Sequence, residues 1–77
     1  MKRLTVHENE NLFTAEQREA ITICHNKYFE AEMADSKTED REKAQALVEL
    51  RTFFPDVVML IPNFFTGNDT LIMRGAE

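Results

Sequence analysis

The chain has 77 residues, a single cysteine and a formal net charge of −5, from 14 acidic and nine basic residues. A chain of this length forms one domain, here residues 1–77, and buries only about 60% of its unfolded surface. The single cysteine excludes an internal disulfide, and the Lys and Arg residues are too dispersed for the phosphate contacts of nucleic-acid binding. We therefore expect no direct nucleic-acid binding. Because the core of so small a chain is limited and no internal disulfide can add to it, we also expect the fold to be stabilised by self-association.

Export and membrane insertion are not expected either. Met1-Lys2-Arg3 is followed by no apolar segment of the kind that a secretory signal carries. The longest apolar run, Val57 to Ile61, has five residues, whereas a helix that spans a bilayer needs about 20. A lone cysteine is typical of reducing compartments, so the sequence predicts a cytoplasmic protein with no membrane contact.

The first residues predict a short strand followed by a linker. From Arg3 to Val6 polar and apolar residues alternate, which is the pattern of a strand with two different faces. Residues 7–11, HENEN, are polar and rich in turn-forming types, so we expect a linker there.

A long helix is predicted from Thr14 to about Ala34. Thr14 and Gln17 stand three positions apart, the capping-box spacing in which each side chain satisfies a backbone N–H of the other residue. At about 100° per residue, the apolar side chains form one stripe along this helix. The predicted stripe is Ala20, Ile21, Cys24, Tyr28 and Ala31, with Ile23 and Ala34 at its edge.

A second helix is predicted after the polar break at residues 35–38. Ser36 and Glu39 repeat the capping-box spacing, and the helical pattern continues to about Phe53, before Pro55 ends it. The predicted apolar face is Ala46, Leu47, Leu50, Phe53 and Phe54. Because the connection is short, the two helices are expected to lie antiparallel as a helical hairpin.

The C-terminal segment is far more apolar than the rest of the chain. Twelve of the 21 residues from Phe53 to Met73 are apolar, and none is Lys or Arg. The β-branched run from Val57 and the turn-forming pair Gly67-Asn68 predict a β-hairpin over about 57–74. We therefore predict an α+β fold: an antiparallel helical hairpin packed on a small C-terminal β-hairpin, with a short N-terminal strand. The alternative is an all-α fold in which Pro55-Asp56 opens a third short helix at 55–61.

A turn at Gly67-Asn68 gives the hairpin two apolar faces. One face carries Val58, Leu60, Phe64, Leu71 and Met73, and the other carries Val57, Met59, Ile61, Phe65 and Ile72. The helical hairpin can cover only one face. We expect the face with Val57 and Ile72 to stay open and to contact another protein chain, and the face with Val58 to pack on the helices.

A second candidate contact lies on the first helix. Phe29 and Met33 are an i, i+4 pair that lies off the core stripe, so they either form a contact surface or pack beneath the N-terminal strand or the hairpin. Phe64 and Phe65 likewise serve either as core anchors or as interface anchors. The predicted protein interface is Phe29, Met33, Val57, Met59, Ile61, Phe64, Phe65 and Ile72.

No pattern of catalytic, metal-binding or cofactor-binding residues stands out in the sequence. His25 adjoins Cys24, but neighbouring side chains diverge on a helix, so we expect a surface histidine beside a buried cysteine. The segment from His7 to Glu10 lacks the second histidine of a zinc helix motif. The acidic residues around the helix connection lack the spacing and the glycine of a calcium loop. We expect no catalysis, no metal and no cofactor.

These features predict a small non-enzymatic protein-binding regulator or inhibitor. Small acidic proteins of this size often serve as accessory factors or as virus-encoded inhibitors of host machinery, and only the size of the chain points there. One alternative is a self-assembling structural or accessory subunit. Another is an oligomer that sequesters a small ligand in a pocket between subunits, lined by residues such as His25, Arg18 or Arg74. We expect a homodimer or higher homo-oligomer, with a further protein partner.

Overall fold

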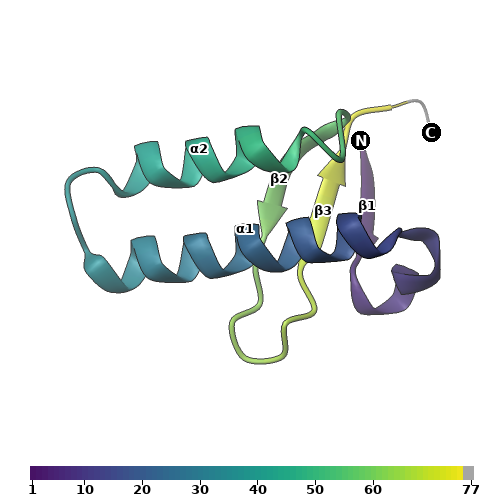
Figure 1. The fold of residues 1–77 in the computed structure, drawn as a ribbon, viewed down its shortest axis with the longest axis horizontal. Coiled ribbons are helices and arrows are strands. Elements are labelled where there is room, and N and C mark those ends of the chain that lie inside the picture. Colours follow the sequence, from purple (N-terminus) through teal and green to yellow (C-terminus); the bar gives the residue numbers. More distant parts are fainter. Residues whose placement is uncertain (76–77) are drawn as a thin grey trace.

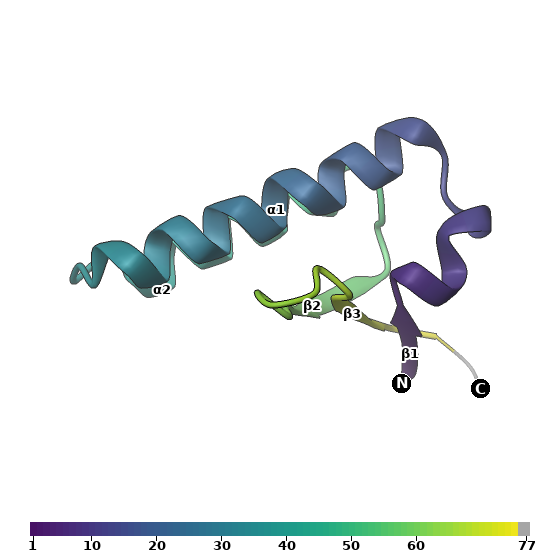
Figure 2. The same cartoon turned by 90° about the horizontal axis from the view of Figure 1, so that it is seen from below.

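The computed structural model describes residues 1–75 and shows the predicted α+β architecture in two layers (Figure 1). In chain order the elements are β1 (Lys2–Thr5), the 3-10 helix η1 (His7–Leu12), α1 (Ala15–Ala34), α2 (Glu39–Leu50), β2 (Val57–Ile61) and β3 (Thr70–Met73). The antiparallel helices α1 and α2 lie on the same side of a three-stranded sheet (Figure 2). The predicted helical hairpin is confirmed, whereas the residues predicted to form a polar linker belong to η1.

The sheet has the strand order β1-β3-β2, and both pairings are antiparallel. Leu71 of the central strand lies opposite Leu4 of β1 and opposite Leu60 of β2, and this leucine row faces the helices. The alternative helix at 55–61 is wrong, because residues 57–61 form β2. Valine and isoleucine favour the extended backbone, and pairing with β3 adds backbone hydrogen bonds between the strands that a separate helix would lack.

The predicted turn of the β-hairpin is wrong. A two-residue turn at Gly67-Asn68 requires pairing of Thr66 with Asp69, but the strands end earlier, with Ile61 opposite Thr70. Pro62 follows directly and has no N–H to donate to the ladder. Residues 62–69 therefore form a connecting loop, in which Gly67 adopts a positive φ of 76°.

A β-bulge changes which valine of β2 enters the core. Val57 lies opposite Met73 and Met59 lies opposite Ile72, so Val58 is the extra residue. Val57 is consequently 1% exposed, and it lies on the core side together with Leu60. The sequence had placed Val57 on the open face and Val58 on the core face, and the bulge reverses that assignment.

Helix α1 matches its prediction closely. Thr14 N donates to Gln17 Oε1 at 2.9 Å, and Gln17 N donates to Thr14 Oγ1 at 3.1 Å, which completes the capping box. Every member of the predicted stripe is buried: Ala20, Ile21, Cys24, Tyr28 and Ala31.

Helix α2 differs from its prediction at both ends. Its N-cap is Thr38, so Ser36 and Glu39 form no capping box; instead Ser36 Oγ accepts a hydrogen bond from Thr38 N. The helix ends at Leu50, and Thr52 N and Phe53 N then donate three residues back. These tighter turns rotate Phe53 outward to 42% exposure, although it was predicted on the core face. Phe54 is buried, with its ring edge-to-face against Phe13 at 5.4 Å.

Within residues 1–75, no helix combines the length and apolar composition that crossing a membrane requires.

Candidate functional site

The loop of residues 62–69 holds its shape through its own hydrogen bonds. The Asn63 side-chain oxygen accepts from Phe65 N at 3.0 Å and from Thr66 N at 3.2 Å. Gly67 N donates to Asn63 O at 2.8 Å, and Thr66 Oγ1 accepts from Asn68 N at 3.1 Å. An asparagine that hydrogen-bonds the backbone two residues ahead defines an Asx turn, so the loop has a fixed local conformation.

Asp69 anchors the end of this loop to the rest of the molecule. Its side chain is 1% exposed, and Oδ1 accepts from Asn63 N at 2.8 Å. Both carboxylate oxygens lie near His25 Nδ1, at 3.0 and 2.9 Å, so Nδ1 is the nitrogen that carries the proton. His25 had been predicted at the surface, but its side chain is 19% exposed and is held by this contact. The Asp69 backbone oxygen also accepts from Val6 N at 2.8 Å.

The two neighbouring phenylalanines of the loop differ in their surroundings. Phe64 packs beside α1, with its ring 5.2 Å from the His25 ring and 5.4 Å from the Phe29 ring, edge-to-face in both cases. Phe65 is 99% exposed. The loop therefore uses Phe64 as an anchor and displays Phe65 to solvent.

The structure brings some of the predicted interface residues together and separates others. Phe29 contacts Phe64 and is 44% exposed, so it packs partly beneath the hairpin loop, as the alternative for this residue supposed. Met33, one helical turn further along α1, is 69% exposed. Val57 is excluded from the candidate interface, because it lies in the core.

The face of the sheet away from the helices carries the remaining predicted residues. Met59 and Ile72 are cross-strand neighbours, and Met59 and Ile61 are 49% and 40% exposed. Arg3 lies opposite Ile72, and Thr5 lies opposite Thr70, so charged and polar side chains from β1 share this face. Among residues 1–75, no helix or loop covers it (Figure 2).

Arg51 is a structural residue that the sequence did not single out. Its Nε donates to Val57 O at 2.8 Å and its Nη2 donates to Val58 O at 3.1 Å. The guanidinium thus satisfies both carbonyls where the bulge interrupts the ladder. No local pattern indicates this role, because the bulge itself is not visible in the sequence.

An apolar pocket of about 130 Å³ lies between α1 and α2. Its lining is Ala20, Ile23, Cys24, Ala46, Glu49, Leu50 and Phe53. Burial, together with the smaller effect of the nearby Asp69 charge, raises the pKa of the Cys24 thiol to about 11. The thiol is therefore protonated at neutral pH, which makes it a poor nucleophile.

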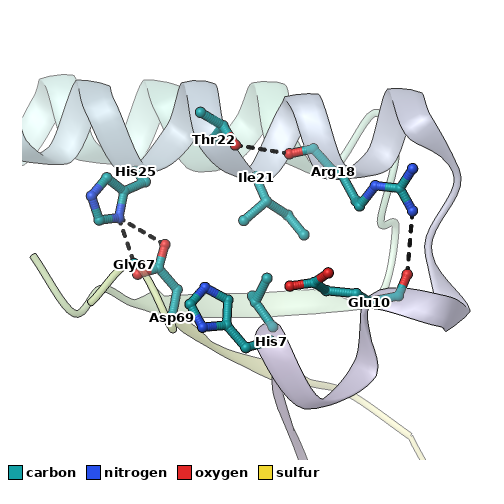
Figure 3. A pocket seen from close by; sticks show the side chains of 9 residues that line it. His7, Glu10, Arg18, Ile21, Thr22, His25, Gly67 and Asp69 are labelled. Carbon is teal, nitrogen blue, oxygen red and sulfur yellow. Dashed lines mark hydrogen bonds and ion pairs between the residues drawn. The ribbon is translucent and has the colours of Figure 1, made fainter.

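A larger cavity of about 360 Å³ lies between α1, η1 and the 62–69 loop (Figure 3). Its lining includes Arg18 and His25, which the sequence had suggested for a ligand pocket, but not Arg74. All of these lining residues come from one chain, so this cavity does not require a second subunit. Within residues 1–75, no three His, Cys, Asp or Glu side chains gather closely enough to hold a metal ion.

The fold and these surfaces define a small two-layer α+β protein with a displayed aromatic loop. No family model, no curated protein and no solved structure matches this chain.

Proposed function

We propose that this chain is a small non-enzymatic binding protein of the cytoplasm, which regulates or inhibits a partner protein through direct contact. The observation that carries the proposal is Phe65: its side chain is 99% exposed at the tip of a loop whose backbone is fixed by hydrogen bonds. Aromatic side chains dominate the energetics of protein interfaces. A loop that is ordered before binding also loses little conformational entropy on association.

The surroundings of Phe65 suit an apolar partner pocket. Residues 57–68 contain no charged side chain, so a partner that covers the loop removes no charge from water. Burial of one phenylalanine side chain contributes about 2–3 kcal/mol. The net charge of −5 on the whole chain favours a partner with a basic rim around that pocket, which accelerates association.

Affinity capture from cells with tagged wild-type protein and a Phe65→Ala variant tests the proposal. Leu12→Ala is the matched control, because Leu12 is an apolar side chain that is 68% exposed on η1, outside the predicted interface. We expect the wild type and the control to retain the same partner, and Phe65→Ala to lose it while keeping its thermal stability. Equal capture by all three proteins contradicts the role of Phe65.

Self-association is a second candidate function, and the apolar pocket between α1 and α2 favours it. Its volume of about 130 Å³ is close to that of apolar cavities of about 150 Å³ that hold a benzene molecule. The phenyl ring of Phe65 from a second copy therefore fits the pocket in size and in chemistry. Sedimentation equilibrium of purified protein separates the two candidates. A homo-oligomer that Phe65→Ala converts to monomer supports self-association, whereas a wild-type monomer at high concentration excludes it.

A further inference from the structure

The cavity between α1, η1 and the 62–69 loop has an apolar floor and a polar rim. Its volume of about 360 Å³ lies in the lower part of the range for small-molecule sites. Val6 and Ile21 are both buried and supply the apolar surface. Figure 3 shows the side chains of His7, Glu10, Arg18 and His25 arranged around this hollow.

Arg18 stands at one end of the cavity with most of its donors free. Its Nη1 donates to Phe13 O at 3.1 Å and to Glu10 O at 3.4 Å, which positions the guanidinium at the C-terminal end of η1. Its Nε and Nη2 donate no hydrogen bond to any atom of residues 1–75. A guanidinium with a free edge is well suited to a carboxylate, which it binds with two parallel hydrogen bonds.

Glu10 presents the opposite charge to the same space. Its carboxylate extends over the cavity in Figure 3, and it accepts no hydrogen bond and forms no ion pair within the described part of the chain. The second acid of the lining, Asp69, differs because His25 and the Asn63 N–H already occupy its oxygens. The cavity therefore holds one free cationic group and one free anionic group that are not paired with each other.

We propose that this cavity binds a small zwitterion of the α-amino acid class. The ligand carboxylate lies on the Arg18 guanidinium, its ammonium group lies on the Glu10 carboxylate, and an aliphatic side chain covers Val6 and Ile21. A simple anion meets repulsion from Glu10, and a simple cation meets repulsion from Arg18. Only a ligand with both charges satisfies both groups. This site is separate from Phe65 and does not depend on the proposed protein partner.

A titration of ¹⁵N-labelled protein with L-leucine, followed by amide chemical shifts, tests the proposal. Two analogues isolate the charges: 4-methylpentanoate lacks the ammonium group, and 3-methylbutylamine lacks the carboxylate. Glycine isolates the apolar contact. We expect saturable shifts at Ile21 and Thr22 with leucine, and at least tenfold weaker binding for both analogues and for glycine.

Three variants assign the charges to their side chains. We expect Arg18→Gln to bind leucine no better than 3-methylbutylamine, and Glu10→Gln to bind it no better than 4-methylpentanoate. Glu30→Gln is the control, because Glu30 is exposed on α1 away from the cavity lining, and it should bind leucine like the wild type. The amide spectrum of each variant reports directly whether it is folded.

Two results overturn the proposal. One is the absence of saturable shifts at about 10 mM leucine, a concentration that detects binding well into the millimolar range. The other is equal binding of leucine and 4-methylpentanoate, which identifies a general anion site without a role for Glu10.

Discussion

The Asp69 carboxylate accepts a hydrogen bond from His25 Nδ1 at 2.9 Å, and this contact joins the β2–β3 loop to α1. The two residues are distant in sequence, and Asp69 is almost completely buried. A buried carboxylate is tolerated only when hydrogen-bond donors surround it. Here the donors are the His25 ring and the Asn63 N–H, so the loop that displays Phe65 depends on Asp69 for its position.

Removal of the Asp69 carboxylate should destabilise the protein substantially. Asp69→Ala leaves the Asn63 N–H and His25 Nδ1 without an acceptor, which we expect to lower the free energy of unfolding by about 3 kcal/mol. Asp69→Asn keeps an acceptor oxygen and should lower the free energy of unfolding by about half as much. Urea denaturation measures the free energy of unfolding of both variants. Asp56→Asn is the control, because Asp56 is exposed, and a loss for that variant as large as for Asp69→Ala refutes the assignment.

The bulge in β2 should depend on Arg51. Arg51→Met keeps the aliphatic part of the side chain but removes the donors to Val57 O and Val58 O. We expect a loss of about 2 kcal/mol in the free energy of unfolding. Arg41→Met, at an exposed position on α2, should change stability by less than about 0.5 kcal/mol. Equal stability of the two variants in urea denaturation shows that the Arg51 hydrogen bonds contribute nothing.

Phe29 and Phe65 should respond differently to the same substitution. Phe65→Asp should leave the free energy of unfolding within about 0.5 kcal/mol of wild type, because the ring touches nothing that the fold needs. Phe29→Asp should lower it by about 1–2 kcal/mol, because the ring packs against Phe64. Both substitutions should disrupt any assembly formed through these residues. Thermal unfolding measures the change in stability, and sedimentation measures the mass of the assembly. An unchanged mass for both variants excludes these two positions from an interface.

The Cys24 thiol should make the protein sensitive to alkaline pH. Its pKa rises from 9.0 in the unfolded chain to about 11 in the folded protein, chiefly through burial. The folded state therefore holds this proton more tightly, so the associated stability is complete below pH 9.0 and is lost as the pH rises towards about 11. Over this pH range we expect the free energy of unfolding to fall by about 2 kcal/mol.

A Cys24→Ala variant isolates this contribution from other groups that titrate at high pH. Each protein is compared with its own stability at neutral pH, which removes the cost of the smaller side chain. The wild type should lose more stability than the variant between pH 9 and 11. Parallel pH profiles for the two proteins contradict a buried, protonated thiol.

Lys43 joins the two helices near their connection. Its Nζ lies 2.9 Å from Glu39 Oε2 and 2.9 Å from Glu32 Oε2. The hydrogen bonds to Glu39 and then to Glu32 raise the pKa of Lys43 above 10.5, so its stabilisation is present below pH 10.5 and is lost above it. Because the Lys43 side chain is 24% exposed and both of its carboxylate partners are more exposed than that, solvent screens the ion pairs, and Lys43→Met should lower the free energy of unfolding by only about 0.5 kcal/mol. High salt should remove most of this difference in urea denaturation, and a difference that persists in high salt points to packing.

The candidate site was only partly predictable from the sequence. Phe65, Met59 and Ile61 were predicted to face away from the core, and all three side chains are exposed. Val57 was misassigned because the extra residue, Val58, reverses the alternation between the side chains before it and those after it. The larger cavity was not predicted within one chain, because its walls come from η1, α1 and the loop. These segments meet only in the folded state.

The sequence by itself determined the two helices, the strand character of both chain ends and the α+β class. The reason is that the Thr14–Gln17 capping box, apolar periodicity and β-branched runs act between residues that are close in the chain. Only the tertiary structure decided the hairpin register, the burial of Asp69 and the separation of Phe64 from Phe65. These features depend on contacts such as His25 with Asp69 and Val6 with Asp69, which join distant segments and compete with the local turn preference of Gly67-Asn68. The display of Phe65 therefore results from the local hydrogen bonds that shape the loop together with the long-range hydrogen bonds that fix its position.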